Sequence, residues 1–238
     1  MLLVQIKEVS NPASFGLVQA VELDIEMPGG PLPGLWLDGG KAAPMLVLAH
    51  GAGAGMRSPF MAGIAEGLAA RGVATLRFEF PYMAAGRKAP DRPQRLVESW
   101  RSAFAAGVDR APGAAFAGGK SMGGRIASMA AADGMPAAGL VFLGYPLHPP
   151  GRPERIRDAH LPAVTVPMLF VQGTRDTFAR PDLLDAVLAR LGPMATRIAV
   201  EGGDHSFRLP GERRDGHAIG ASLAEPVAGF VARVAATG

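Results

Sequence analysis

The chain has 238 residues, of which 48% are hydrophobic, 19% are charged and 6% are aromatic. This length fits one domain with a sizeable core, and the net charge of +3 is too low for a disordered chain of this apolar content. The basic residues are scattered and form no stripe, so nucleic acid is not an expected partner. The absence of cysteine excludes disulfides, cysteine-ligated metals, iron–sulfur clusters and a cysteine nucleophile.

The first residues lack the pattern of a targeting signal. The apolar run Met1 to Val4 ends at Gln5, whereas a signal peptide needs a longer apolar stretch after a basic start. No window approaches the roughly 20 apolar residues of a membrane span. We therefore expect a cytoplasmic protein with no membrane association.

Short apolar runs alternate with longer amphipathic runs along the chain, which predicts one α/β domain over residues 1–238 with a mostly parallel sheet covered by helices on both faces. The part before Asp38 is extended, is broken at Met27–Pro31, and could form an antiparallel edge. The predicted strands that follow are 45–49, 73–80, 114–118, 140–143, 168–172 and 197–200. The predicted helices are 58–71, 94–108, 122–132, 182–191 and 218–236, with a polar loop over 83–93.

The run from Gly119 to Gly123 matches G-x-S-x-G, with Ser121 at its centre. It lies between a predicted strand and a predicted helix, where a nucleophile on a sharp turn needs small residues two positions before and after it. The turn also places the backbone N–H of Met122 at a helix N-terminus, where it can face a developing oxyanion. The motif therefore predicts a nucleophilic serine.

A serine hydroxyl needs a base to take its proton, and the base needs an acid to orient it. Asp176 lies in the turn after one predicted strand, and His205 lies in the turn after the last. The order Ser121, Asp176, His205 is the nucleophile–acid–base order of one known fold. The gaps between them have room for strand and helix units, so the three turns can meet at one sheet edge.

A glycine-rich turn, His50-Gly51-Ala52-Gly53, follows an earlier predicted strand. Its backbone could supply a second oxyanion donor, most directly the Ala52 N–H. Gly51 and Gly53 would let the backbone approach a substrate closely. His50 itself is expected to be structural.

With these parts in order, the sequence resembles the α/β-hydrolase superfamily from about Met45 to the C-terminus. The nearest resemblance is to small lidless members, the dienelactone-hydrolase-like proteins and the KANSL/Tex-like group, and it rests on LAHGAGAGM, GRKAPD, GGKSMGGR, VQGTRDTF and GGDHSF. The resemblance implies a Ser121–His205–Asp176 triad with Met122 and Ala52 as oxyanion donors, and no metal or organic cofactor. Ser121 replaces the cysteine of dienelactone hydrolases, so their lactone substrate is not carried over.

Other residues compete for these roles. His217 is an alternative base but lacks the strand-then-turn context, and Asp204 adjoins His205 but a sequence neighbour usually points elsewhere. His148 could line the cleft. Gly119-Lys120-Ser121 resembles the end of a phosphate-binding loop, but that motif needs glycine where Ala114 stands.

Arg87 and Lys88 lie in the predicted polar loop. They form either a solvated loop face or a basic rim that favours anionic substrates. Residues 144–167, between two predicted strands, are too few for a large cap domain, so we expect an open site for a small-molecule substrate. The predicted activity is ester or related acyl hydrolysis. The alternative is a non-catalytic interaction scaffold of the same fold, because proteins of the KANSL/Tex-like group can be complex subunits.

Overall fold

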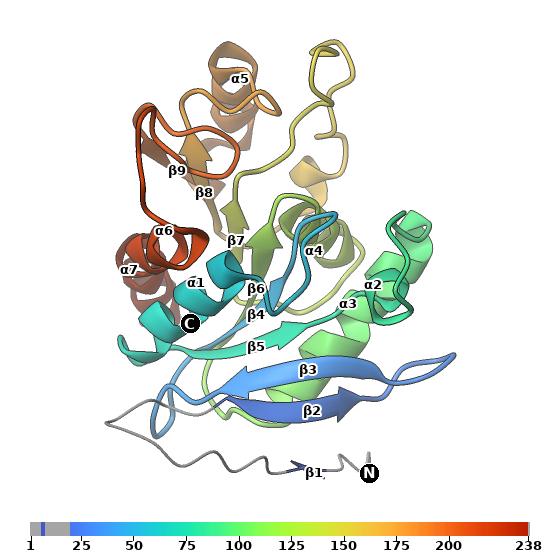
Figure 1. The fold of residues 1–238 in the computed structure, drawn as a ribbon. Helices are drawn as coiled ribbons and strands as arrows, with labels where there is room; N and C mark the ends of the chain where they lie inside the picture. The colour runs from blue at the N-terminus through green and yellow to red at the C-terminus, as the bar shows by residue number, and fades with distance from the viewer. Residues whose placement is uncertain (1–5, 8–19, 238) are drawn as a thin grey trace.

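The computed structural model describes residues 6–7 and 20–237, which form a nine-stranded sheet with helices on both sides (Figure 1). The strand order is β1-β2-β3-β5-β4-β6-β7-β8-β9. The strands are β1 Ile6–Lys7, β2 Val21–Ile25, β3 Leu32–Leu37, β4 Met45–Ala49, β5 Ala74–Phe78, β6 Ala115–Lys120, β7 Leu140–Leu143, β8 Met168–Gly173 and β9 Ala195–Val200. The helices are α1 Pro59–Ala69, α2 Pro81–Ala84, α3 Pro93–Val108, α4 Met122–Ala132, α5 Pro181–Leu191, α6 Gly216–Ser222 and α7 Ala224–Ala235, with short 3₁₀ turns η1 Leu161–Ala163 and η2 Gly192–Met194. The N-terminal run considered for a targeting signal lies outside the described residues.

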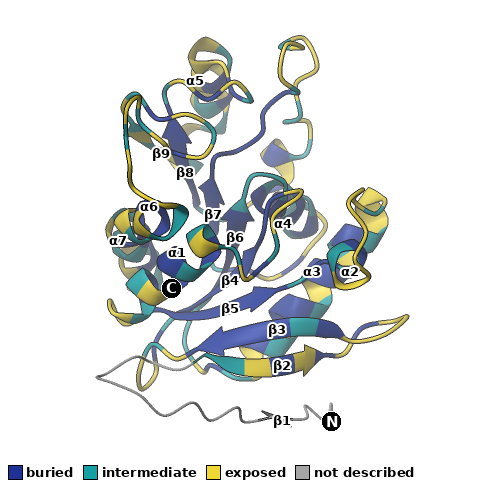
Figure 2. Ribbon diagram, in the orientation of Figure 1, coloured by how far each residue is buried: buried dark blue, intermediate teal, exposed yellow. Residues whose placement is uncertain are grey.

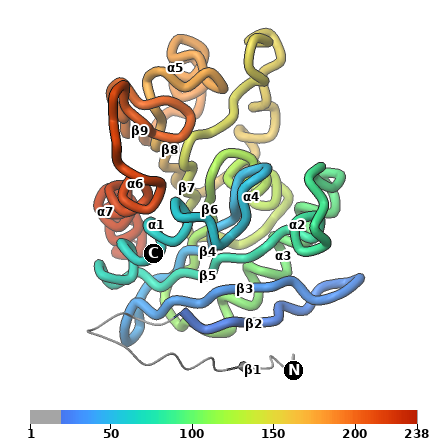
Figure 3. Tube along the Cα trace, in the orientation of Figure 1, coloured from blue at the N-terminus to red at the C-terminus, as the bar shows by residue number. Residues whose placement is uncertain are grey.

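Strands β4 to β9 are parallel, whereas β2 and β3 form an antiparallel hairpin that joins the sheet through β5. The predicted mostly parallel sheet with an antiparallel edge is therefore confirmed. Figure 3 shows the chain running from the blue hairpin at one edge to the orange strands β8 and β9 at the other. Along the sheet, β5 lies on one side of β4 and β6 on the other. In open α/β sheets ligands bind at such a switch point, beyond the carboxyl ends of the strands.

The two sheet faces are covered by separate apolar clusters, because successive residues of a strand point to opposite faces. In β4, Met45 and Val47 belong to the cluster that includes Trp100 of α3. Leu46 and Leu48 of the same strand belong to the cluster that includes the apolar residues of α1, α6 and α7. The dark blue central strands of Figure 2 reflect this burial from both sides. The predicted strands are uninterrupted apolar runs for this reason.

Two predicted elements need correction. The predicted polar loop over 83–93 begins inside the short helix α2, since Pro81 fixes a helical φ at its first position. The predicted terminal helix over 218–236 is two helices, α6 and α7, that meet at Leu223. Pro226 has no N–H to donate to the carbonyl of Ser222, and its ring crowds that carbonyl, so one continuous helix cannot pass this point.

The stretch Gly216–Ala235, with mean hydropathy 1.3, is long and apolar enough to cross a membrane by length and composition alone. This corrects the expectation that no window reaches that level. In the fold, its apolar residues Ile219, Val227 and Phe230 are buried against α1 and the sheet. The stretch is thus a pair of core helices in this structure.

Candidate active site

Ser121 lies at the turn between β6 and α4, with φ of 50° and ψ of −117°. Few non-glycine residues adopt such a conformation, and it costs about 1–3 kcal/mol. The flanking glycines allow the turn to press against β4. A Cβ added at Gly119 or Gly123 would lie 2.2 or 2.3 Å from the Ala49 carbonyl oxygen. The G-x-S-x-G spacing is therefore required by the packing of this turn.

Substituting Gly123→Ala should destabilise the fold strongly. The new methyl group would meet only backbone atoms at 2.3–2.7 Å, and these cannot move aside as a side chain would. We expect a loss of about 3 kcal/mol or more, which lowers the melting temperature by roughly 6 °C or more. Thermal unfolding followed by circular dichroism measures this. The control is Gly229→Ala in α7, where the nearest atom lies 3.8 Å away. Equal melting temperatures for the two variants would contradict the clash.

The structure brings Ser121, His205 and Asp176 together at the carboxyl edge of the sheet. His205 Nε2 lies 2.8 Å from Ser121 Oγ, and His205 Nδ1 lies 2.7 Å from Asp176 Oδ2. A carboxylate oxygen accepts hydrogen bonds, so Nδ1 carries the ring proton and Nε2 is left to accept the serine hydroxyl hydrogen. The side chain of Asp176 is fully buried, whereas that of His205 is 20% exposed. The serine–histidine end of the array thus remains accessible.

Two residues that the sequence did not indicate hold this array in place. Gln172 Nε2 donates to Asp176 Oδ2 at 2.6 Å, and the Phe178 N–H donates to Asp176 Oδ1 at 2.8 Å. The Phe178 ring also stacks on the His205 ring, with centroids 4.1 Å apart. The carboxylate therefore accepts three hydrogen bonds, which fix its position and orientation.

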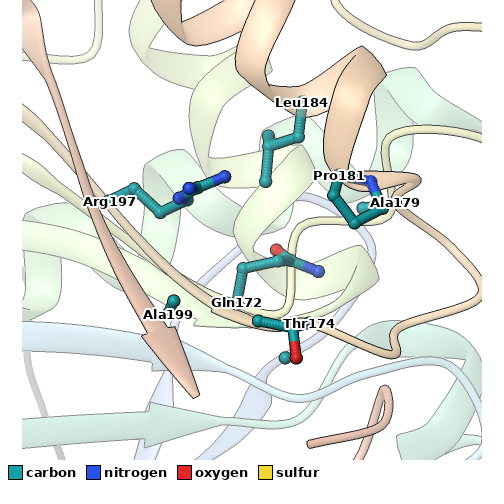
Figure 4. A pocket seen from close by; sticks show the side chains of 8 residues that line it. Gln172, Thr174, Ala179, Pro181, Leu184, Arg197 and Ala199 are labelled. Atoms are coloured by element: carbon teal, nitrogen blue, oxygen red, sulfur yellow. The ribbon is translucent and has the colours of Figure 1, made fainter. Parts of the chain in front are cut away.

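Gln172 is also part of the wall of a small cavity between β8, β9 and α5 (Figure 4). Its Oε1 accepts a hydrogen bond from the Tyr145 N–H at 2.8 Å, so the amide links the loop after β7 to Asp176. Leu184 and Arg197 also line this cavity. Neither Ser121 nor His205 lines it, so this cavity is separate from the serine–histidine pair.

Lys120, the residue before Ser121, is turned toward the histidine turn. Its ammonium donates to the His205 carbonyl oxygen at 2.6 Å and lies 5.3 Å from the centroid of the Phe207 ring. Desolvation lowers the pKa of Lys120 from 10.5 to about 8, against the opposing effect of Asp176 and Asp204. The ammonium is thus already engaged by the histidine turn, which disfavours the phosphate-loop interpretation.

The β4–α1 loop, residues 50–58, lies beside the serine turn. Gly51 faces Ser121 so closely that a Cβ added to it would lie 3.5 Å from Ser121 Cβ. Gly53 has a φ of +80°, which favours glycine, and the turn closes with a hydrogen bond from the Ala54 N–H to the Gly51 carbonyl at 3.3 Å. Ala52, between the two glycines, is exposed.

His50 fixes the direction of the Ala52 N–H. His50 Nδ1 donates to the Gly51 carbonyl oxygen at 2.8 Å, and in a trans peptide the next N–H points the opposite way. The ring is itself held at Nε2, which accepts a hydrogen bond from the Phe80 N–H at 3.1 Å. His50 is completely buried and is structural, as expected.

Met122 is the first residue of α4, so its N–H has no acceptor within the helix. It adjoins Ser121 at the positive end of the helix dipole. The backbone N–H groups of Met122 and Ala52 thus come from the two loops that flank the switch point between β4 and β6.

The predicted basic rim is partly neutralised. Arg87 forms an ion pair with Asp91 at 2.6 Å in the segment between α2 and α3, and Lys88 beside it is exposed. Within the described part of the chain, no hydrogen bond or ion pair joins either side chain to Ser121, Asp176 or His205.

The competing residues have other partners. His217 pairs with Glu66 at 2.8 Å, and Asp204 Oδ1 accepts from the N–H groups of Ser206 and Arg208 at 2.8 and 2.9 Å. His148 is buried, and its Nε2 accepts from the Arg180 N–H at 3.0 Å in the segment after β8.

The comparison with known families identifies the fold. A family model described as an alpha/beta hydrolase domain matches residues 42–234, which is most of the chain. The chain belongs to the α/β-hydrolase family. The predicted resemblance to this superfamily is thereby confirmed, and Ser121, Asp176 and His205 all lie within the matched residues.

Solved structures similar to this α/β hydrolase share its fold at low sequence identity. A lidless α/β serine hydrolase from Xanthomonas campestris is 17% identical with a TM-score of 0.66, over 94% of this chain and 96% of that chain. A dienelactone hydrolase from Anabaena variabilis is 21% identical with a TM-score of 0.71, over 92% and 99%. An esterase from Pyrococcus furiosus is 16% identical with a TM-score of 0.70, over 91% and 93%. These likenesses bear out the predicted lidless architecture; the KANSL/Tex-like resemblance stays a prediction.

Proposed function

We propose that this α/β hydrolase is a serine hydrolase that cleaves an ester or related acyl bond of a small substrate. The observation that carries the proposal is the hydrogen-bonded chain from Ser121 Oγ through the His205 ring to Asp176 Oδ2, with steps of 2.8 and 2.7 Å. The order of the three groups and the two short distances are those that activation of a serine nucleophile needs.

In the proposed reaction, Ser121 Oγ attacks the substrate carbonyl carbon while His205 Nε2 takes the hydroxyl proton. The imidazolium that forms is stabilised by the Asp176 carboxylate. The tetrahedral intermediate collapses, the ester C–O bond breaks, and His205 returns the proton to the departing alcohol. Water then attacks the acyl-enzyme by the same steps and releases the acid and free Ser121.

The oxygen of the tetrahedral intermediate carries a negative charge that needs donors fixed in advance. The proposal assigns this role to the N–H groups of Met122 and Ala52. The positive end of α4 and the His50–Gly51 hydrogen bond, which fixes the Ala52 peptide, support the assignment. Gly51 and Gly53 would let substrate approach this backbone closely.

The segment between β7 and β8 contains one short 3₁₀ turn, η1, and no cap domain. An open site of this kind suits small or accessible acyl substrates. A basic rim at Lys88 and Arg87 that favours anionic substrates stays a proposal, with Arg87 already paired to Asp91. We also propose one domain over the whole chain, a cytoplasmic location, and a small molecule as the partner in place of nucleic acid or membrane.

The scaffold alternative has less support. A scaffold has no need for a strained serine, and a Ser121 φ of 50° is a conformation that structures keep where it serves a site. Three polar side chains from separate turns, held by Gln172 and Phe178, are equally unnecessary for binding a partner.

An active-site serine probe tests the proposal directly. A fluorophosphonate should add one mass label per chain, and peptide mapping should place it on Ser121, because only a serine activated by its base reacts quickly. Heat-denatured protein, in which the array is lost, should stay unlabelled. A panel of chromogenic esters of increasing acyl length then gives the substrate class. An intact protein that neither reacts with the probe nor hydrolyses any ester contradicts the proposal.

A further inference from the structure

The cation of Lys120 has no obvious place in the reaction proposed above. An ammonium removed from water is unfavourable unless nearby groups compensate for it. In this protein it is held one residue before Ser121, and it donates to a main-chain oxygen of His205, 85 residues away in the sequence. The Lys120 ammonium thus links the residue beside the candidate nucleophile to the turn that carries the candidate base.

Gly144, which follows β7, provides the space that this cation occupies. A Cβ added at Gly144 would lie 3.1 Å from Lys120 Nζ, 3.4 Å from the His205 carbonyl oxygen and 3.6 Å from Asp176 Oδ2. The ammonium, the histidine backbone and the carboxylate thus surround one point. Gly144 has a φ of +73°, so a side chain is disfavoured there for conformational reasons as well.

The histidine turn contains a residue in an uncommon backbone conformation. Phe207, two residues after His205, has a φ of 62°, which is uncommon for an aromatic residue. Its ring lies beneath the Lys120 ammonium, 5.3 Å from ring centroid to nitrogen. Lys120 therefore contacts the turn on both sides of Ser206, through the carbonyl of His205 and the ring of Phe207.

We propose that Lys120 is a positioning residue of this hydrolase: its ammonium fixes the His205 backbone relative to the adjoining Ser121 and balances the charge of the Asp176 carboxylate. The inference rests on the proposed function. We call the hydrogen bond from the Lys120 ammonium to the His205 carbonyl oxygen the tether. Through it, the distance between Ser121 Oγ and His205 Nε2 depends on the Lys120 side chain as well as on the sheet. The charge acts in two directions, because it favours the Asp176 carboxylate and opposes the His205 imidazolium. The charged groups that act on it are Asp176 and Asp204, and the oxygen that it binds is the main-chain carbonyl of His205.

The test compares wild type, Lys120→Met, Lys120→Gln and the control Lys41→Met, whose lysine is exposed. Methionine matches the length of the lysine stem without the charge or the donor, and glutamine restores a donor without the charge. We expect Lys120→Met to lower kcat about 10- to 100-fold on an ester that the wild type hydrolyses, with KM changed less than about threefold. Lys120→Gln should recover part of the loss, and Lys41→Met should match wild type.

Two further readouts separate positioning from simple stabilisation. The pH at which kcat/KM reaches half its plateau should move upward in both Lys120 variants, because a cation that opposes the imidazolium has been removed. The melting temperature of Lys120→Met should fall, because the His205 carbonyl oxygen loses its donor and the Asp176 carboxylate loses a nearby cation. The kinetics are therefore measured well below that melting temperature, where the variant is folded.

The failures can be told apart. A Lys120→Met variant with wild-type kcat, or one whose kcat falls only in step with its melting temperature, overturns the positioning role. An unmoved pH midpoint overturns the charge effect, and a Lys120→Gln variant no faster than Lys120→Met overturns the tether. A wild type that is inactive on esters and unlabelled by fluorophosphonate overturns the proposed function, and the inference with it.

Discussion

Replacing Ser121 by alanine should abolish ester turnover while leaving the fold intact. Without the hydroxyl no acyl-enzyme can form, and His205 and Asp176 have no group to activate. We expect kcat to fall by about 10⁵- to 10⁶-fold. The strained φ of 50° is no easier for alanine, so the melting temperature should change little. Initial rates on the best ester of the panel, with a parallel melting curve, measure both.

The matched control is Ser128→Ala in α4, the helix that follows Ser121. Ser128 is completely buried, and its hydroxyl lies 2.7 Å from His160 Nε2, so it is a second serine with a histidine partner. The Ser128 hydroxyl donates to the Arg125 carbonyl oxygen. Desolvation lowers the pKa of His160 to about 4, so we expect this serine–histidine pair to be structural. Ser128→Ala should cost about 1 kcal/mol of stability and keep its turnover. Turnover that survives Ser121→Ala would contradict the assignment of the nucleophile.

The chemistry-bearing residues could be predicted because each follows a strand, and parallel strands deliver their carboxyl ends to one edge of the sheet. To predict Ser121, Asp176 and His205 as candidates, the strand pattern and the known nucleophile–acid–base order along the chain were enough. The residues that hold them were not predicted, because Gln172 and Phe178 meet Asp176 through side-chain rotamers and turn geometry. Lys120 carried a usable signal: a lysine at the end of a central strand, between glycine and serine, has little access to solvent.

The errors in the predicted elements have local causes. The break between α6 and α7 follows from Pro226, and apolar periodicity alone runs past it because both helices bury the same face. The pairing of Arg87 with Asp91 could not be read from their spacing, since four residues apart implies contact only in a helix, and α2 ends at Ala84.

Replacing Asp176 by asparagine should lower kcat by about 10⁴-fold, while the variant still folds to the same structure. In the wild-type structure, Asp176 Oδ2 accepts from both His205 Nδ1 and Gln172 Nε2, at 2.7 and 2.6 Å. Its Oδ1 accepts from the Phe178 N–H. An amide has one acceptor oxygen and one donor nitrogen. If the nitrogen faces His205, it favours the tautomer that lacks the Nδ1 proton, and Nε2 can no longer accept the Ser121 proton. If the nitrogen faces Phe178 instead, two donors meet, and the neutral amide still fails to stabilise the imidazolium.

Asp204→Asn is the comparison that isolates this effect, because Asp204 is also a carboxylate beside His205. Its Oδ1 accepts only backbone N–H groups, from Ser206 and Arg208, and an asparagine oxygen can accept the same two bonds. We expect kcat within about threefold of wild type for this variant. Fluorophosphonate labelling rates should follow kcat, since both depend on the basicity of His205 toward Ser121. Equal losses in the two variants would mean that general electrostatics near the histidine, and not the hydrogen bond to Asp176, sets the reactivity of the serine.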